Sequence, residues 1–243
     1  MATRVIAFLP VHNEEQHLGP LLERFKPLLE RGPVHELLVV DDGSTDRTPE
    51  ILRGYGRCTV ITHPARQGCG DAIRSAYRYA LEKNYDIFVI MAGNGKDDPR
   101  EIERLVTPIF RDAADYVQGS RFLKGRSSQG LPRHRRWAMR LFTWTFSLFL
   151  MRHYTDCTNG FRAYRTTILR DQRLNWAQEW LGHSYEVAFY MHYKVAALGY
   201  RLEEVPVSKI YRFSVGGSYT KVRLRDWITN LKPLFFLRLG IKD

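Results

Sequence analysis

Residues 5–15 read VIAFLPVHNEE and residues 37–46 read LLVVDDGSTD. In each stretch an apolar run of strand length leads directly into polar residues, a pattern typical of buried parallel strands. The apolar runs predict strands at Val5 to Leu9, Leu37 to Val40, Thr59 to Thr62, Ile87 to Met91 and Tyr116 to Gly119. Helical periodicity between them predicts helices at Glu14 to Leu29, Thr48 to Tyr55, Asp71 to Lys83 and Glu101 to Phe110. This alternation predicts a Rossmann-like α/β fold with a mostly parallel sheet flanked by helices.

The pattern changes after Gly119. A loop rich in glycine, serine and cations is expected from Arg121 to Arg136, where it could act as a lid. The segments expected after it are an amphipathic helix at 134–153, a turn at Thr158 to Gly160, a helix at Tyr185 to Leu198, a strand at Arg201 to Val207, and a C-terminal amphipathic helix within 222–243, at Arg223 to Leu239 with a kink at Pro233.

Composition narrows the function classes. The 243 residues carry a formal net charge of +11, which favours phosphate-bearing partners. The three cysteines contain no CxxC pair, so neither a disulfide framework nor a zinc site is supported, and a reducing, cytoplasmic setting is expected. The N-terminal apolar run is too short for a signal peptide. The longest apolar stretch, Trp137 to Met151, is interrupted by Arg140 and is expected to lie on a membrane rather than span it.

Ligands bind such sheets beyond the carboxyl ends of the strands. Those ends carry Pro10 to Glu14, Asp41 to Asp46 and Ala92 to Asp98, so three polar loops are expected to meet at one crevice. Carboxylates there could accept hydrogen bonds from a base or a ribose, and Gly43 permits a sharp turn. The alternative is that Asp41 to Asp46 forms only a turn and a helix cap.

Taken together, these loops resemble the family 2 glycosyltransferases of the GT-A fold. The resemblance extends through Arg66 to Ala72, Gly119 to Arg121, Asp156 to Tyr164, and Leu198 to Val207. The later segments are similar to the dolichol- or polyprenyl-phosphate mannosyltransferase branch, which acts in cell-envelope polysaccharide biosynthesis. The resemblance implies a single GT-A domain over 1–221, with a nucleotide-sugar half at 1–120 and an acceptor half at 121–221. It implies that the nucleotide is held by Pro10, His12, Asn13, Glu14, Asp41, Asp42, Gly68 and Gly70.

One departure from the family concerns its Asp-x-Asp motif, which binds Mg²⁺ or Mn²⁺ at the donor diphosphate. Here the two aspartate positions hold Ala92 and Asn94. A hard divalent cation prefers carboxylate oxygens, so the usual metal site is weakened. Two repairs are open: Lys96 could neutralise the diphosphate itself, or Asn94 with Asp97 or Asp98 could hold a metal. The loop could also be only a solvated turn before Pro99.

The negative charge that develops on the departing nucleoside diphosphate has to be stabilised by groups held in the site. The expected catalytic residues are Asn94, Lys96, Asp97, Asp98 and Arg121. Further phosphate contacts are expected from Arg212, Ser218 and Lys221, unless that segment is simply an exposed basic loop. A phosphate acceptor is already ionised, so no strong general base is required; Glu186 would be a candidate base for a hydroxyl acceptor, or else a helix N-terminal charge.

The expected function is inverting transfer from a UDP- or GDP-sugar to a polyprenyl phosphate, by a protein held peripherally at the inner face of a membrane. Cations beside the aromatic residues of 134–153 favour contact with anionic lipids, although a core or dimer helix is the alternative. A soluble or saccharide hydroxyl acceptor, and an inactive nucleotide- or membrane-binding relative, remain open. A homo-oligomer is possible, and no nucleic-acid module is recognised.

Overall fold

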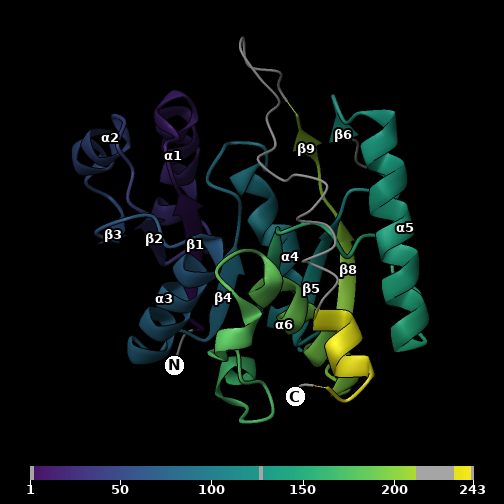
Figure 1. Cartoon of the computed structure of the whole chain (residues 1–243). Helices are drawn as coiled ribbons and strands as arrows, with labels where there is room; N and C mark the ends of the chain where they lie inside the picture. Colours follow the sequence, from purple (N-terminus) through teal and green to yellow (C-terminus); the bar gives the residue numbers. More distant parts are fainter. Residues whose placement is uncertain (1–2, 126–127, 212–232, 242–243) are drawn as a thin grey trace.

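A seven-stranded sheet forms the middle of the computed structural model, which describes residues 3–125, 128–211 and 233–241 (Figure 1). The strand order is β3-β2-β1-β4-β7-β5-β8. Its strands are β1 (Val5–Val11), β2 (Glu36–Asp41), β3 (Thr59–Thr62), β4 (Ile87–Ile90), β5 (Tyr116–Ser120), β7 (Arg162–Arg165) and β8 (Leu202–Pro206). All its pairings are parallel except those of β7, which runs against β4 and β5. The predicted mostly parallel GT-A-like α/β sheet is confirmed.

Helices cover both faces of the sheet. They are α1 (Glu15–Glu30), α2 (Thr48–Tyr55), α3 (Cys69–Glu82), α4 (Ile102–Phe110), α5 (Arg133–Leu150) and α6 (Glu186–Ala197), with short 3₁₀ turns η1 (Pro99–Glu101), η2 (Thr166–Arg170) and η3 (Glu179–Leu181). Alternate residues of each strand face opposite cores. Val5, Ala7 and Leu9 of β1 pack with α1 and α4, whereas Ile6 and Phe8 pack with α3 and α6. Burial of both faces explains why the strands are nearly continuous apolar runs.

The sequence predicted no strand at the position of β7, so the expected layout is corrected by adding this strand. Its sequence, Arg-Ala-Tyr-Arg, has only two apolar residues, yet Arg162 is buried. The Arg162 guanidinium donates to the carbonyl oxygens of Asn159, Cys157 and Ala188 at 2.6–3.1 Å. Because its partners are backbone oxygens brought in from elsewhere, a cation can occupy a central strand where the local sequence pattern does not indicate one.

The segment expected to be a lid contains regular structure. β6 (Ser128–Gln129) pairs in parallel with β9 (Lys209–Ile210), directly after β8. Helix α5 begins at Arg133 and ends at Leu150, so it is shorter than the expected 134–153; Met151 ends it with a left-handed φ of 52°. Of the predicted C-terminal helix, residues 233–238 are helical, and 212–232 lie outside the described residues.

Helix α5 lies along one side of the molecule, on the opposite side from α2 (Figure 1). It packs on α6 through Phe142 and Phe146, which meet Phe189 and Tyr193 in a small third core. In the view of Figure 1, α2 is drawn at the β3 end of the sheet and α5 at the β8 end.

Candidate active site at the carboxyl edge of the sheet

The carboxyl ends of β1, β2 and β4 lie side by side. Val11 of β1 is in register with Asp41 of β2, and Met91 after β4 donates its N–H to the carbonyl oxygen of Phe8 at 3.1 Å. A Cβ built on Gly93 would lie 2.5 Å from the carbonyl oxygen of Pro10. Only glycine therefore allows the loop after β4 to approach the loop after β1 so closely. The structure brings the three polar loops of the sequence together at one edge.

Side chains join the first loop to the second. Asn13, with a left-handed φ of 54°, accepts from the N–H of Thr45 at 2.8 Å, and its own N–H donates to Ser44 Oγ at 2.9 Å. The N–H of Glu14 donates to Thr48 Oγ1 at 2.9 Å. Asparagine tolerates this backbone conformation better than most residues. The predicted residues Asn13 and Glu14 thus hold the shape of the site through their backbone and amide groups.

Asp42 organises three segments although it is buried. Its carboxylate accepts from Nδ1 of His63 and from the N–H groups of Gln67 and Gly68, each at 2.8 Å. Burial by itself would raise the pKa of Asp42, but these hydrogen bonds outweigh burial and hold the pKa below its ordinary value. Nδ1 of His12 lies 2.8 Å from the Asp42 carbonyl oxygen, which can only accept. Asp42 therefore fixes the glycine-containing loop beside the first two.

Asp41 is also buried, and its carboxylate accepts from the N–H of Ser44 at 3.0 Å. This bond closes the turn that Gly43 makes with a φ of +66°. Asp41, which was expected to hold the nucleotide, thus also closes the turn that was its alternative role.

Gly68 and Gly70 lie against the segment before α6. A Cβ on Gly68 would come 2.2 Å from the carbonyl oxygen of His183, and the N–H of Gly70 donates to that oxygen at 2.9 Å. Glu186, at the start of α6, accepts from the N–H of Ser184 at 3.1 Å. The glycines therefore permit backbone-to-backbone packing, and Glu186 supports the same segment.

The loop after β4 contains two buried charges of opposite sign. Lys96 is 6% exposed and Asp97 is fully buried. Burial lowers the pKa of Lys96 to about 8, and the charge of Lys209 adds to the shift. Nζ of Lys209 lies 3.0 Å from Oδ1 of Asp97, whereas Asp98 caps η1 and pairs with Arg100 at 2.7 Å. Asn94 Oδ1 lies 3.4 Å from the Lys96 N–H, across the same turn.

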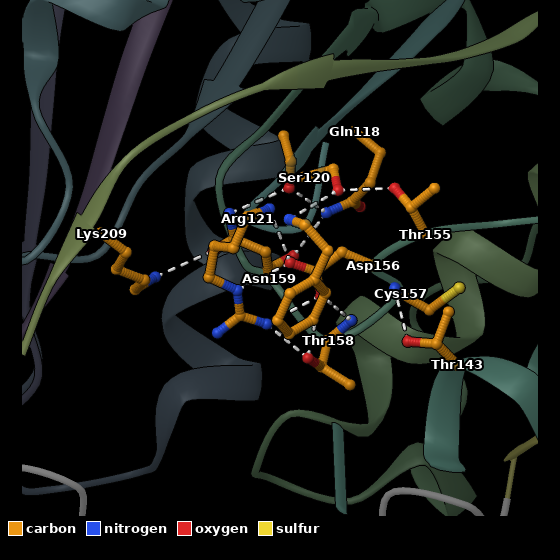
Figure 2. Close-up of polar contacts among 12 residues, drawn as sticks. Gln118, Ser120, Arg121, Thr143, Thr155, Asp156, Cys157, Thr158, Asn159 and Lys209 are labelled. Atoms are coloured by element: carbon orange, nitrogen blue, oxygen red, sulfur yellow. Dashed lines mark hydrogen bonds and ion pairs between the residues drawn. The ribbon is translucent and has the colours of Figure 1, made fainter. Parts of the chain in front are cut away.

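Arg121 and Asp156 form a buried ion pair (Figure 2). Nε and Nη2 of Arg121 donate to the two carboxylate oxygens of Asp156 at 2.7 and 2.8 Å. Nη1 donates to the hydroxyl of Tyr211 at 2.6 Å. Burial opposes charge on both partners, but their attraction dominates: it raises the pKa of Arg121 above its ordinary range and lowers the pKa of Asp156. Arg121 is therefore held rigidly, with Tyr211 as its neighbour toward β9.

The sequence did not single out Lys209, His63 or Asn159 as site residues. Lys209 begins β9, shortly after the end of β8, which is parallel to β5, and its Nζ donates to Oδ1 of Asn159 at 2.9 Å (Figure 2). The rule that placed the first three loops at the strand ends would have selected Lys209 too, had it been applied to the predicted strand at Arg201 to Val207. His63, after β3, satisfies the same rule. Arg212, Ser218 and Lys221 lie outside the described residues.

The family and several relatives can be identified from the sequence. The profile described as Glycosyl transferase family 2 matches residues 7–173. The chain is 32% identical over 217 residues to an undecaprenyl-phosphate mannosyltransferase of Micrococcus luteus, covering 86% of this chain and 84% of that one. It is 29% identical over 212 residues to a polyprenol monophosphomannose synthase of Mycolicibacterium smegmatis, covering 84% and 77%.

Solved structures agree in fold. Glucosyl-3-phosphoglycerate synthase of Mycobacterium tuberculosis, crystallised with Mn²⁺, UDP and phosphoglyceric acid, superposes with a TM-score of 0.70 at 19% identity. The match covers 100% of this chain and 80% of that one. At this identity the similarity concerns the fold alone. The family match and the relatives together establish that the chain belongs to glycosyl transferase family 2 and resembles its polyprenyl-phosphate glycosyltransferase branch.

Proposed function

We propose that this chain transfers a sugar from a UDP- or GDP-linked donor to a polyprenyl-type lipid phosphate, with inversion at the anomeric carbon. One observation carries the proposal: Tyr211 contacts both the buried cations Lys96 and Arg121 and helix α5. It accepts from Arg121 and packs with Met139 of α5, a helix that also exposes an apolar face. The relatives from Micrococcus luteus and Mycolicibacterium smegmatis support it, because their names specify mannose transfer to, or synthesis of, such lipid phosphates.

The donor would lie across the three joined loops. Its base and ribose would meet the loops that contain Asn13 and Asp41, and its diphosphate would meet the loop that contains Lys96. Parallel sheets bind nucleotides at this edge because the strand ends leave polar backbone and side-chain groups facing one crevice. Asp42 would act by positioning, since its carboxylate is already committed to His63 and two backbone N–H groups.

The reaction needs an anionic nucleophile and a stabilised leaving group. An oxygen of the acceptor phosphate would attack the anomeric carbon from the side opposite the donor phosphate and form a new C–O bond. The bond between that carbon and the β-phosphate oxygen would break, and the electron pair would leave with the nucleoside diphosphate. The acceptor oxygen is ionised near neutral pH, so no proton has to be removed in this step. The main task left to the protein is to stabilise the negative charge on the donor diphosphate and on the acceptor phosphate.

Helix α5 supplies a surface suited to a lipid acceptor. Trp137, Leu141, Trp144, Leu148 and Met151 are exposed at spacings of three and four residues, so they form one stripe. Arg133, Arg136 and Arg140 are exposed near the start of the same helix. Apolar residues rimmed by cations are what an interfacial helix uses to bind an anionic bilayer. No helix in the described part of the chain combines the length and apolar character needed to cross a membrane.

The start of α5 lies next to the candidate catalytic cations. Leu131 and Met139 pack with Tyr211, and the Arg140 guanidinium lies 5.4 Å from the ring centre of Phe122. Tyr211 in turn accepts from Arg121. A lipid whose chain followed the α5 stripe could therefore bring its phosphate to the Arg121 side of the site.

A transfer assay tests the proposal. The purified protein would be given UDP- and GDP-sugars labelled in the sugar, with either a polyprenyl phosphate or the matching polyprenol in detergent. We expect label to enter the organic phase only with the phosphate, and to be released as free sugar by mild acid because the product is a glycosyl phosphodiester. Phosphoglyceric acid serves as a water-soluble control acceptor. Transfer to that acceptor alone, or none with any donor, would contradict the proposal.

A further inference from the structure

The carboxyl end of β4 is a poor site for a divalent cation. Ala92 has no ligand atom, and the amide oxygen of Asn94 faces the N–H of Lys96 at 3.4 Å. Mg²⁺ and similar cations require several oxygen ligands, with carboxylates preferred. Among residues 3–125, 128–211 and 233–241, no group of three histidine, cysteine, aspartate or glutamate residues is placed to hold a metal ion. The residues that the structure describes at this edge do not fit a metal-bound diphosphate.

The nearby carboxylates are already neutralised by cations of the protein. Both oxygens of Asp97 lie within 3.2 Å of Nζ of Lys209, and the N–H of Ala92 approaches Oδ2 at 3.3 Å. Asp98 forms an ion pair with Arg100 and accepts from the Arg100 N–H at 3.1 Å. A metal would have to compete with these cations for either carboxylate. Displacing Lys209 from Asp97 would leave a charge buried without compensation.

Lys96 has the placement that a counter-charge to the diphosphate requires. Its side chain is almost fully buried, its carbonyl oxygen accepts from the N–H of Ile210 at 3.0 Å, and its Nζ lies 5.8 Å from the ring centre of Tyr211. These contacts hold the loop after β4 against β9. The cation is therefore fixed at the edge where the loops after β1 and β4 meet.

The local charges favour an anion. Among the described residues, the charges that most affect the pKa of Lys96 are the cations of Lys209 and Arg135 and the carboxylates of Asp97 and Glu14. Together with Lys96, these groups comprise three cations and two carboxylates, so the five carry one net positive charge. A fixed cation at a partly water-excluded site stabilises developing phosphate charge more strongly than the same cation in water.

We propose that Lys96 takes the place of a divalent cation opposite the donor diphosphate, while Lys209 neutralises Asp97, so that this chain binds nucleoside diphosphates and transfers sugar without added metal. Lysine acts on phosphate as a point charge and needs no ligand set. The inference rests on the proposed function, because it assumes that a nucleotide donor occupies this edge.

The test measures binding rather than turnover. UDP and GDP, with the matching nucleosides uridine and guanosine, would be titrated calorimetrically into the full chain in EDTA and again in excess Mn²⁺. We expect the diphosphate to bind in EDTA with a Kd within about threefold of its value in Mn²⁺. Lys96→Ala should weaken diphosphate binding in EDTA by on the order of tenfold or more, and should leave nucleoside binding unchanged.

Two further variants control the test. Lys96→Arg keeps the charge and is expected to retain most of the diphosphate affinity, which separates charge from folding. Lys83→Ala removes an exposed lysine at the end of α3 and should change nothing. Binding that EDTA abolishes and Mn²⁺ restores would overturn the lysine proposal and leave the transferase proposal standing. Binding of no nucleotide or nucleoside in either buffer would overturn both.

Discussion

The exposed stripe on α5 leads to a quantitative prediction for membrane binding. Trp137 and Trp144 are 71% and 63% exposed. A tryptophan presents roughly 200 Å² of side-chain surface, so the pair offers about 270 Å² to a bilayer. If half of that area leaves water, at about 25 cal/mol per Å² the gain is about 3 kcal/mol. The double variant Trp137→Ser, Trp144→Ser should therefore bind vesicles on the order of a hundredfold more weakly.

Co-sedimentation with vesicles containing phosphatidylglycerol measures this loss. Both side chains are largely in water, so the variant should keep the thermal stability of the parent chain. Phe110→Ser is the matched control, because Phe110 is 47% exposed at the end of α4 on another surface. Higher salt should weaken binding further by screening the arginines at the start of α5. Equal vesicle binding by the double variant, the control and the parent chain would refute the assignment of α5 as the membrane-facing helix.

Three further predictions concern stability. Asp156→Ala removes the partner of the buried Arg121 and should cost about 3–5 kcal/mol in the free energy of unfolding, measured by urea denaturation. Burial holds the pKa of His192 well below 6.5, and the charge of Arg162 adds to this shift. The unfolded chain therefore takes up a proton at His192 in a pH range where the folded chain does not. Stability should fall by about 1.4 kcal/mol per pH unit below roughly pH 6.5, and His192→Phe should remove that part of the slope. Gly43→Ala places a Cβ 2.6 Å from the Arg66 nitrogen at a φ of +66° and should cost about 1–3 kcal/mol in thermal unfolding.

Two of the stability predictions have a control variant. Asp112 pairs with Arg201 at the surface and is 75% exposed, so Asp112→Ala should cost far less than Asp156→Ala. Gly54 lies inside α2 with nothing within 4 Å of a built Cβ, so Gly54→Ala should be neutral or stabilising. Equal losses within either pair of variants, or an unchanged pH slope in His192→Phe, would contradict the corresponding argument.

The helices and strands that the sequence predicted are those with strong local patterns. β1 and β2 are apolar runs buried on both faces, and each is followed by turn-forming polar residues. β7 could not be predicted in this way, because its burial depends on strands β4 and β5 on either side and on carbonyl partners for Arg162. The position of this strand is a property of the assembled sheet.

The site residues, like the strands, were predicted where a local pattern indicated them and missed where their role depends on distant partners. Because ligands bind at the carboxyl ends of parallel strands, the sequence predicted that the loops of Asn13, Asp42 and Lys96 lie at one edge of the sheet. It did not reveal that Asp97 is held by Lys209, 112 residues away, because that contact depends on β8 lying next to β5. The roles of buried charges are set by such distant partners, so the sequence can nominate a carboxylate without showing what it binds.

A crystal structure of the chain with its preferred nucleoside diphosphate, grown in EDTA, tests the central claim most directly. We predict the base and ribose against the loops of Asn13 and Asp41, with the diphosphate within contact distance of Nζ of Lys96. Nucleotide density away from the carboxyl ends of β1, β2 and β4 would contradict the account.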